Sequence, residues 1–250
     1  MQRLAAIGSA YNEITVYETS QLDGETGKFR CIRFADEDVQ GAMDLKDRRR
    51  LVLGYQKAMT ALMEHRDPDF RSAFVIGHGI GSISGYFRGK RIKTAEIDEA
   101  VVELSRRYFD CADDNVEIGD GRQLLEAEAD RSLDFIVLDA FTSRGTPQHL
   151  TTVEFFRLAA NKLRLQGALL LNMMGRPQDD SMAEAIRSTL RRAFADVRCY
   201  SLPAPRERDR RNLIFVGSGA SDGLDSREIG LREIELAEGY IIWDGSAAWR

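Results

Sequence analysis

Two short segments near the start of the chain alternate between apolar and polar residues, the pattern of strands with one buried face. They are residues 13–19 (EITVYET) and 29–35 (FRCIRFA), and the turn-forming sequence Asp23-Gly24 lies between them. We therefore predict an antiparallel β-hairpin, within a small N-terminal β element that covers residues 1–45.

The next pattern is helical. Between residues 44 and 65, apolar side chains recur at the three- and four-residue spacing of one helix face, at Leu51, Tyr55, Ala58, Met59 and Leu62. The sequence Asp67-Pro68 is expected to end this helix, because proline cannot continue it.

After this helix, short apolar runs alternate with stretches of helical spacing. The runs expected to be strands are residues 73–76, 92–96, 115–118, 134–138 and 168–172. The expected helices are residues 81–88, 98–109, 121–129, 151–164 and 178–194. Nearly continuous apolar strands are typical of a parallel sheet whose two faces are both covered by helices. The chain is therefore predicted to be an α/β protein.

The end of the sheet is expected to differ. Residues 197–202 and 213–217 are separated by too few residues for a crossover helix, which favours an antiparallel pair. A mostly parallel Rossmann-like sheet with an antiparallel C-terminal hairpin is the layout of class I S-adenosylmethionine-dependent methyltransferases, and we predict that fold class. Residues 46–220 would form this domain, and residues 221–250 a C-terminal helix (225–238) and tail.

Composition and charge exclude several classes of protein. The chain has 250 residues and a net charge of −5, which gives no support to nucleic acid as a partner. Two arginine clusters, residues 48–50 and 206–211, are flanked or interrupted by acids and are interpreted as solvated surface. No apolar run approaches the roughly 18–20 residues of a membrane span, and no signal peptide is recognisable. We expect a cytoplasmic protein.

Three distant cysteines without a C-x-x-C pair argue against a disulfide framework and against a zinc site. No metal is therefore expected. The candidate chemistry lies instead in a glycine-rich turn, Gly77-His78-Gly79-Ile80-Gly81, which directly follows the strand 73–76. Glycines allow the backbone to approach a ligand closely.

Acidic residues follow three of the predicted strands, at the edge of the sheet where ligands bind in α/β proteins. Glu96 can accept hydrogen bonds from ribose hydroxyls, Asp120 from the adenine amine, and Asp139 is expected nearest the reacting carbon. Asp98 is interpreted as the cap of the following helix. The predicted nucleotide-binding residues are Gly77, Gly79, Gly81, Glu96, Ile97, Asp120 and Gly121.

The glycine spacing G-x-G-x-G, together with Asp120 on the third strand, disfavours NAD and favours an S-adenosyl nucleotide. These motifs resemble the spermidine synthase (polyamine aminopropyltransferase) family from Tyr11 to Gly217. The matching segments are 11–14, Gln40, 77–81, 95–98, 119–120 and 135–139. Residues 146–156 and 163–167 resemble the spermidine synthase-like branch in particular.

The resemblance implies polyamine biosynthesis by transfer of an aminopropyl group from decarboxylated S-adenosylmethionine to a small amine. It implies that Asp139 is the catalytic acid that orients and helps to deprotonate the amine. It places Gln40 near the adenosyl or amine site. It also implies a homodimer.

The sequence departs from the family in the amine half of the site. Ile80 stands where the family has an aspartate that contacts the aminopropyl amine, and Thr142 replaces a second acid. The family's Tyr-His-Glu signature is absent, and Leu53-Gly-Tyr55-Gln56 stands in that region. Since burying an unpaired charge costs several kcal/mol, these changes make a diamine such as putrescine a doubtful acceptor. The candidate acceptor-site residues are Gln40, Tyr55, His78, Ile80 and Thr142.

Several interpretations stay open on the sequence alone. His78 could contact a ligand or only fill space, and His149 is expected in the loop that caps the following helix. The replacement of the loop aspartate by Ile80 also makes a methyltransferase credible, with S-adenosylmethionine as donor and a small nucleophile as acceptor. A third alternative is a non-catalytic adenosyl-binding module.

Overall fold

The N-terminal part of the chain is a small antiparallel sheet. The computed structural model describes residues 1–35, 39–111, 115–142, 145–206, 208–221, 223 and 226–246. The sheet consists of β1 (Gln2–Gly8), β2 (Glu13–Leu22), β3 (Glu25–Phe34) and β4 (Val39–Asp44), in that order. The predicted hairpin is confirmed as β2–β3, and its turn contains Asp23 and Gly24, both with positive φ. The flanking strands β1 and β4 are additional to the prediction.

The second sheet forms the body of the molecule. Its strands are β5 (Ser72–Ile76), β6 (Arg91–Glu96), β7 (Val116–Ile118), β8 (Leu133–Leu138), β9 (Leu163–Gly175), β10 (Asp196–Ser201), β11 (Arg211–Ser218) and β12 (Arg232–Glu233). Their spatial order is β12-β10-β11-β9-β8-β5-β6-β7. Strands β5 to β9 are parallel, whereas β11 runs antiparallel between β9 and β10. The predicted mostly parallel sheet with an antiparallel C-terminal hairpin is confirmed.

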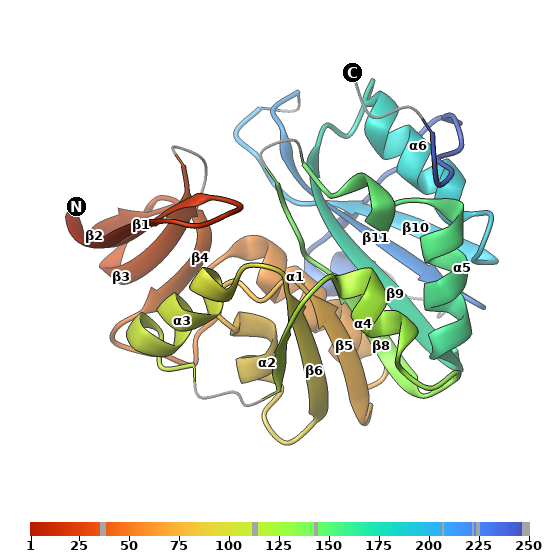
Figure 1. The fold of residues 1–250 in the computed structure, drawn as a ribbon. Helices are drawn as coiled ribbons and strands as arrows, with labels where there is room; N and C mark the ends of the chain where they lie inside the picture. The colour runs from red at the N-terminus through yellow and green to blue at the C-terminus, as the bar shows by residue number, and fades with distance from the viewer. Residues whose placement is uncertain are drawn as a thin grey trace.

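Helices cover both faces of this sheet, as Figure 1 shows. The helices are α1 (Gly54–Arg66), α2 (Ser82–Tyr86), α3 (Glu99–Tyr108), α4 (Gly121–Glu126), α5 (Val153–Lys162) and α6 (Ser181–Leu190), with short 3₁₀ turns η1 (Gln148–Leu150) and η2 (Ser226–Ile229). Alternate residues of β5 belong to two different cores: Phe74 packs with α5 and α6, and Val75 packs with α1. Burial on both faces explains why these strands read as uninterrupted apolar runs.

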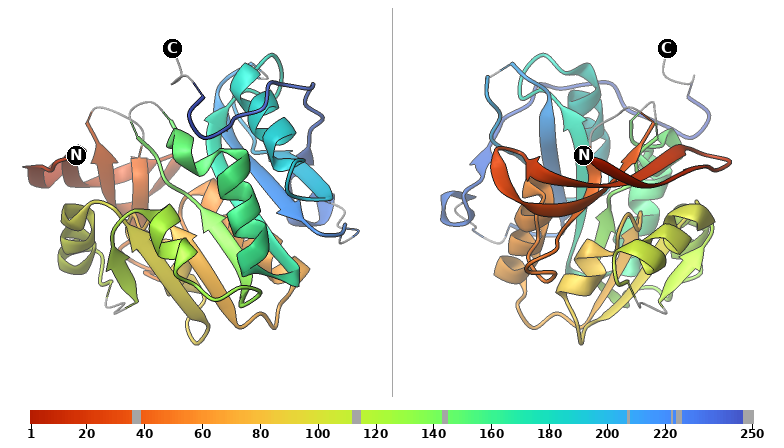
Figure 2. Two further views of the ribbon diagram at one scale, coloured as in Figure 1. Left: turned by 45° about the vertical axis from the view of Figure 1, so that its right-hand side comes forward. Right: turned by 90° about the vertical axis from the view of Figure 1, so that its left-hand side faces the viewer.

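The N-terminal sheet is joined to the body by a further apolar cluster. Ile32 of β3 and Met43 of β4 pack there with Val101 and Leu104 of α3 and with Ile80 of the glycine turn. Figure 2 shows the red and orange strands of this sheet lying beside α3 at one end of the main sheet. The small sheet is therefore packed against the edge of the body at which the parallel strands β5 and β6 end.

Two of the predicted helices are wrong in extent or in kind. The helix expected from residue 44 begins only at Gly54, because Asp44 ends β4 and Leu51 forms an isolated bridge with Met43. The helix expected at 225–238 does not form within the described part of that segment, which contains η2 and β12. Its apolar residues pack separately, Leu231 against the α1 side and Leu236 against the α6 side, and Gly230 between η2 and β12 has a φ of 69°.

The helices are also short. Within the described ranges, none has the length and the apolar character that crossing a membrane would require.

Candidate active site

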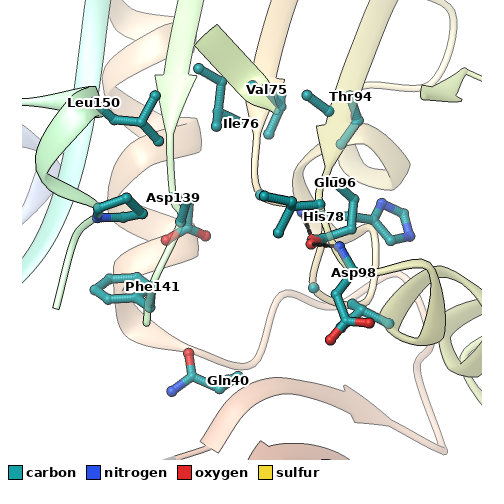
Figure 3. Close-up of a pocket in the computed structure, with 18 of the residues that line it drawn as sticks. Gln40, Val75, Ile76, His78, Thr94, Glu96, Asp98, Asp139, Phe141 and Leu150 are labelled. Carbon is teal, nitrogen blue, oxygen red and sulfur yellow. Dashed lines mark hydrogen bonds between the residues drawn. The ribbon is translucent and has the colours of Figure 1, made fainter. Parts of the chain in front are cut away.

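A cavity of about 290 Å³ opens at the carboxyl ends of β5, β6 and β8. The glycine turn and the ends of these strands form its walls, and Gln40 of β4 closes it from the N-terminal sheet (Figure 3). Ligands of open α/β sheets bind at this edge. All the predicted nucleotide-binding residues line the cavity.

The glycine turn is shaped by close backbone packing. A Cβ at Gly77 would lie 2.2 Å from the carbonyl oxygen of Asp139, and Gly77 has a φ of 100°. Only glycine allows this contact without strain. Gly121 is similarly required, since its Cβ would lie 2.4 Å from the side chain of Ile76. These glycines therefore bring the ends of β5 and β8 and the start of α4 around one cavity.

Glu96 ends β6 and is fixed by the backbone around it. Its carboxylate accepts hydrogen bonds from the N–H groups of His78 at 2.9 Å and of Asp98 at 3.0 Å. Burial raises the pKa of Glu96, and these two donors oppose the rise. Each carboxylate oxygen keeps a further acceptor position, so Glu96 can still bind a ribose hydroxyl in the cavity. Ile97 beside it is 43% exposed.

Asp98 is also held by two hydrogen-bond donors. Its side chain caps α3 by accepting a hydrogen bond from Ala100 N–H, and Ser9, between β1 and β2, donates to its other oxygen. The prediction that Asp98 is a helix cap is confirmed.

Asp120 is engaged by the protein on both oxygens. It caps α4 through the N–H groups of Arg122 and Gln123, and its second oxygen lies 2.8 Å from His149 Nε2. His149 lies in η1, in the loop before α5, while Thr152 supplies the cap of that helix. An adenine amine approaching Asp120 would therefore meet a carboxylate already oriented by the start of α4 and by His149.

Asp139 directly follows β8 and has two side-chain partners. Asn172 Nδ2 on β9 donates to its Oδ1 at 2.9 Å, and the Tyr55 hydroxyl on α1 donates a second hydrogen bond. Burial raises the pKa of Asp139 to about 6, against the effect of these two donors. Burial, followed by the charge of Asp139, raises the pKa of Tyr55 well above its usual value. Asp139 is thus a carboxylate that can take a proton near neutral pH.

The candidate acceptor-site residues Gln40, Tyr55 and Thr142 line the cavity. Figure 3 shows Gln40 on the side of the cavity where Asp139 and Phe141 lie. The backbone carbonyl oxygen of Gln40 also lies 3.4 Å from the Tyr55 hydroxyl oxygen. Ser143, which follows Thr142 in the sequence, lies outside the described residues.

Of the other two candidate acceptor-site residues, His78 lines the cavity but turns its ring toward α3, and Ile80 is not among the lining residues. The His78 ring lies 2.8 Å from Ser105 Oγ of α3, on the far side of the turn from Asp139 (Figure 3). Ile80 is 8% exposed and packs against Ile32 and Gly41 of the N-terminal sheet. The three glycines of this turn, Gly77, Gly79 and Gly81, all have positive φ.

Two polar residues near Asp139 were missed by the sequence reasoning. Asn172 is fully buried and Gln56 is 4% exposed at the cavity wall. The signal for Asn172 was a single amide within the otherwise apolar run ALLLNMM. Across the described ranges, no group of three or more His, Cys, Asp or Glu side chains is arranged to hold a metal ion.

Known proteins share both the sequence and the fold. A polyamine aminopropyltransferase of Vibrio vulnificus is 26% identical over 222 residues, and a probable polyamine aminopropyl transferase of Bifidobacterium longum is 29% identical over 174. The matches cover 83% and 65% of this chain. They span 70% of the Vibrio protein but only 38% of the Bifidobacterium protein.

The structural likeness extends over almost the whole chain. The crystal structure of a probable spermidine synthase from Corynebacterium glutamicum superposes with a TM-score of 0.79, at 20% identity, over 98% of both chains. A spermidine synthase in complex with the transition-state analogue AdoDATO superposes at 0.67, with 19% identity, over 95% of this chain and 82% of that one. Human methyltransferase-like protein 13 in complex with SAH superposes at 0.59, with 21% identity, over 71% and 88%.

These likenesses confirm the class I methyltransferase-type fold. The family is shown by sequence, because the profile of the spermine/spermidine synthase domain matches residues 52–218, which include the glycine turn, Glu96, Asp120 and Asp139. The chain belongs to the spermine/spermidine synthase family.

Proposed function

We propose that this protein transfers an aminopropyl group from decarboxylated S-adenosylmethionine to a small amine. The observation that carries the proposal is Asp139: a buried carboxylate, held by Tyr55 and Asn172, on the wall of the cavity formed by the glycine turn. Its pKa of about 6 suits the acceptance of a proton from an amine at neutral pH.

The charges of the cavity favour the decarboxylated nucleotide. Its described lining residues include four carboxylates, Glu96, Asp98, Asp120 and Asp139, and include neither lysine nor arginine. The carboxylate of S-adenosylmethionine would enter this negative environment without a cationic side chain to offset its desolvation. The aminopropyl ammonium of the decarboxylated form carries the opposite charge and suits it.

The residues then have separate roles in the proposed reaction. Glu96 binds the ribose hydroxyls, and Asp120 lies at the adenine end beside His149. The glycine turn holds the nucleotide so that the carbon next to its sulfonium faces Asp139. The amine nitrogen attacks that carbon, the carbon–sulfur bond breaks with its electron pair on sulfur, and Asp139 takes the proton. Alignment of the two substrates supplies most of the acceleration.

Methyl transfer from S-adenosylmethionine is the second candidate. The observation that favours it is the position of Ile80, which is buried beneath the N-terminal sheet and leaves the glycine turn without a carboxylate for the aminopropyl amine. Its weakness is the absence of lysine and arginine from the described cavity lining.

Calorimetric titration with each nucleotide, followed by mass spectrometry of products from a pool of amines, tests the proposal. We expect tighter binding of the decarboxylated nucleotide and a mass increase of one aminopropyl group on an amine. Preference for S-adenosylmethionine with methylated products would establish the second candidate instead. Binding without any turnover, unaffected by Asp139→Asn, would indicate a non-catalytic module.

The resemblance to the family also leads us to propose a homodimer. Light scattering coupled to size exclusion should then give twice the 28.2 kDa mass of the chain. A mass equal to one chain at micromolar concentration would contradict this.

A further inference from the structure

Asp139 is the first member of a row of three polar side chains that crosses β8, β9 and β11. Asn172 Nδ2 donates to Asp139 Oδ1 at 2.9 Å, and Asn212 Nδ2 donates to Asn172 Oδ1 at 3.0 Å. Asn172 is 0% exposed, and its neighbours Leu171 and Met173 belong to the apolar core. A buried amide is stable only when its polar atoms are paired, so both hydrogen bonds are needed.

The donor and acceptor atoms in this row can be assigned from the chemistry of the three side chains. An ionised carboxylate can only accept hydrogen bonds, so Asn172 must turn its NH₂ group toward Asp139. The oxygen of the Asn172 amide then faces β11, where Asn212 must donate to it. If residue 212 could not donate, the Asn172 oxygen would be left buried without a partner, and the amide would no longer be fixed in this orientation.

We propose that Asn172 and Asn212 are positioning residues for the transfer reaction, and that they hold the Asp139 carboxylate ionised and in one orientation at the cavity wall. This inference rests on the function proposed above. Neither asparagine lines the cavity, so both act through Asp139 rather than on a substrate. Asn172 acts directly, and Asn212 acts by fixing the amide of Asn172.

The surroundings of Asp139 leave few other groups that could set its ionisation. Tyr55 of α1 is a titratable group in contact with Asp139. Burial is the dominant influence on the pKa of Asp139. The remaining titratable residues of the cavity wall are Tyr11, His78, Glu96, Asp98, Asp120 and His149. Three of these acids are oriented by backbone N–H groups at the starts of α3 and α4 or in the glycine turn. In the strand order the asparagines lie on β9 and β11, on one side of β8, whereas these acids follow β6 and β7 on its other side.

The test is to follow the ionisation of Asp139 directly. Aspartate labelled with ¹³C at the side-chain carboxyl gives an NMR signal for each aspartate, and Asp139→Asn assigns the signal of interest. In Asn172→Leu we expect protonation of Asp139 to become favoured by about tenfold, the usual effect of losing one hydrogen bond to a charged group. Asn212→Leu should also favour protonation of Asp139, but by a smaller factor.

Leu170→Val is the matched control, because Leu170 lies on β9 in the apolar core and outside the row. It should lower the melting temperature without moving the Asp139 titration. Unchanged titration in both asparagine variants, or an equal shift in Leu170→Val, would overturn the inference. Asn212→Leu keeps the test decisive if Asn172→Leu does not fold.

The rate of aminopropyl transfer supplies the second readout. Since Asp139 must be ionised to take a proton, the acid limb of the pH–rate profile should move to higher pH in both asparagine variants. Transfer with an unmoved acid limb would overturn the positioning role while leaving the proposed function intact. If the NMR titration shifts in the variants but the unmodified protein catalyses no transfer, the proposed function is overturned. The influence of the two asparagines on Asp139 would then still hold.

Discussion

At the scale of single residues, the site depends on contacts that couple the backbone of one strand end to the side chain of another. Gly77 permits β5 to approach the backbone of Asp139. Glu96, at the end of β6, binds the N–H of His78 in the turn that follows β5. The groups assigned to ribose and to the acceptor amine are therefore held in fixed relation by the glycine turn.

Asp139→Asn should reduce transfer by about 10²–10⁴-fold, the usual contribution of a general base. The same change should stabilise the fold at pH 7.5 by about 1–3 kcal/mol. Burial raises the pKa of Asp139 from 3.8 to about 6, so its favourable contribution to stability is complete below pH 3.8 and lost as pH rises through 6. Urea unfolding at pH 7.5 and at pH 4.5 checks this, because the gain should shrink at the lower pH.

Glu96→Ala should weaken binding of the nucleotide by about 1–3 kcal/mol, the usual cost of losing charge-assisted hydrogen bonds. Calorimetry measures the effect. Glu99→Ala is the matched control, since Glu99 is exposed in the first turn of α3 and lies outside the cavity lining. An unchanged affinity in Glu96→Ala would show that the ribose binds elsewhere.

At the scale of elements, the C-terminal segment acts as an extended strap and not as a helix. Val153 N–H of α5 donates to the Ile242 carbonyl, and Ile242 N–H donates to Thr189 Oγ1 of α6. Beyond it, Asp244 pairs with Arg122 in the first turn of α4, the helix that Asp120 caps. Figures 1 and 2 show this dark blue segment running along α6 and α5. The strap thus ties two helices to the edge of the site.

Ile242→Ala should lower the free energy of unfolding by about 2–4 kcal/mol, the range for truncating a large apolar residue in a core. Ile242 is 1% exposed and packs in the cluster beneath α5 and α6. Urea denaturation measures the loss. Tyr240→Ala, two residues away and 54% exposed, should change stability by less than about 0.5 kcal/mol. Equal effects in the two variants would mean that the strap is not anchored at Ile242.

At the scale of the whole molecule, the small N-terminal sheet closes the cavity and shares an apolar cluster with the body. Ile80 lies at the centre of this contact, against Gly41 and Ile32. The residue that departs most clearly from the family motif is therefore part of the joint between the two sheets. An acid at this position would disrupt the packing between the two sheets rather than contact a substrate.

Ile80→Asp should destabilise the fold by about 3 kcal/mol or more, because it buries an unpaired charge. Ile80→Val, which keeps the site apolar, should cost only about 0.5–1.5 kcal/mol. Thermal unfolding of both variants measures the difference. A stable Ile80→Asp protein that gained affinity for a diamine would show instead that residue 80 faces the cavity.

Much of the fold could be predicted from local patterns. The runs at 73–76 and 134–138 became β5 and β8, and Asp98 became the cap of α3. These features depend on nearby residues and on burial alone. The helix expected at 225–238 failed because its apolar residues pack one by one against two different faces, and periodicity cannot distinguish that from a helix face.

The sequence by itself determined that carboxylates would gather beside a glycine turn, because parallel strands end at one edge of their sheet. Only the tertiary structure decided where single side chains point. The His78 ring lies against Ser105 of α3, and Ile80 packs beneath the N-terminal sheet. Asn172 meets Asp139, and Asn212 meets Asn172, because three strands, distant in sequence, pair in one register. Such contacts depend on strand order and register, which no local pattern contains.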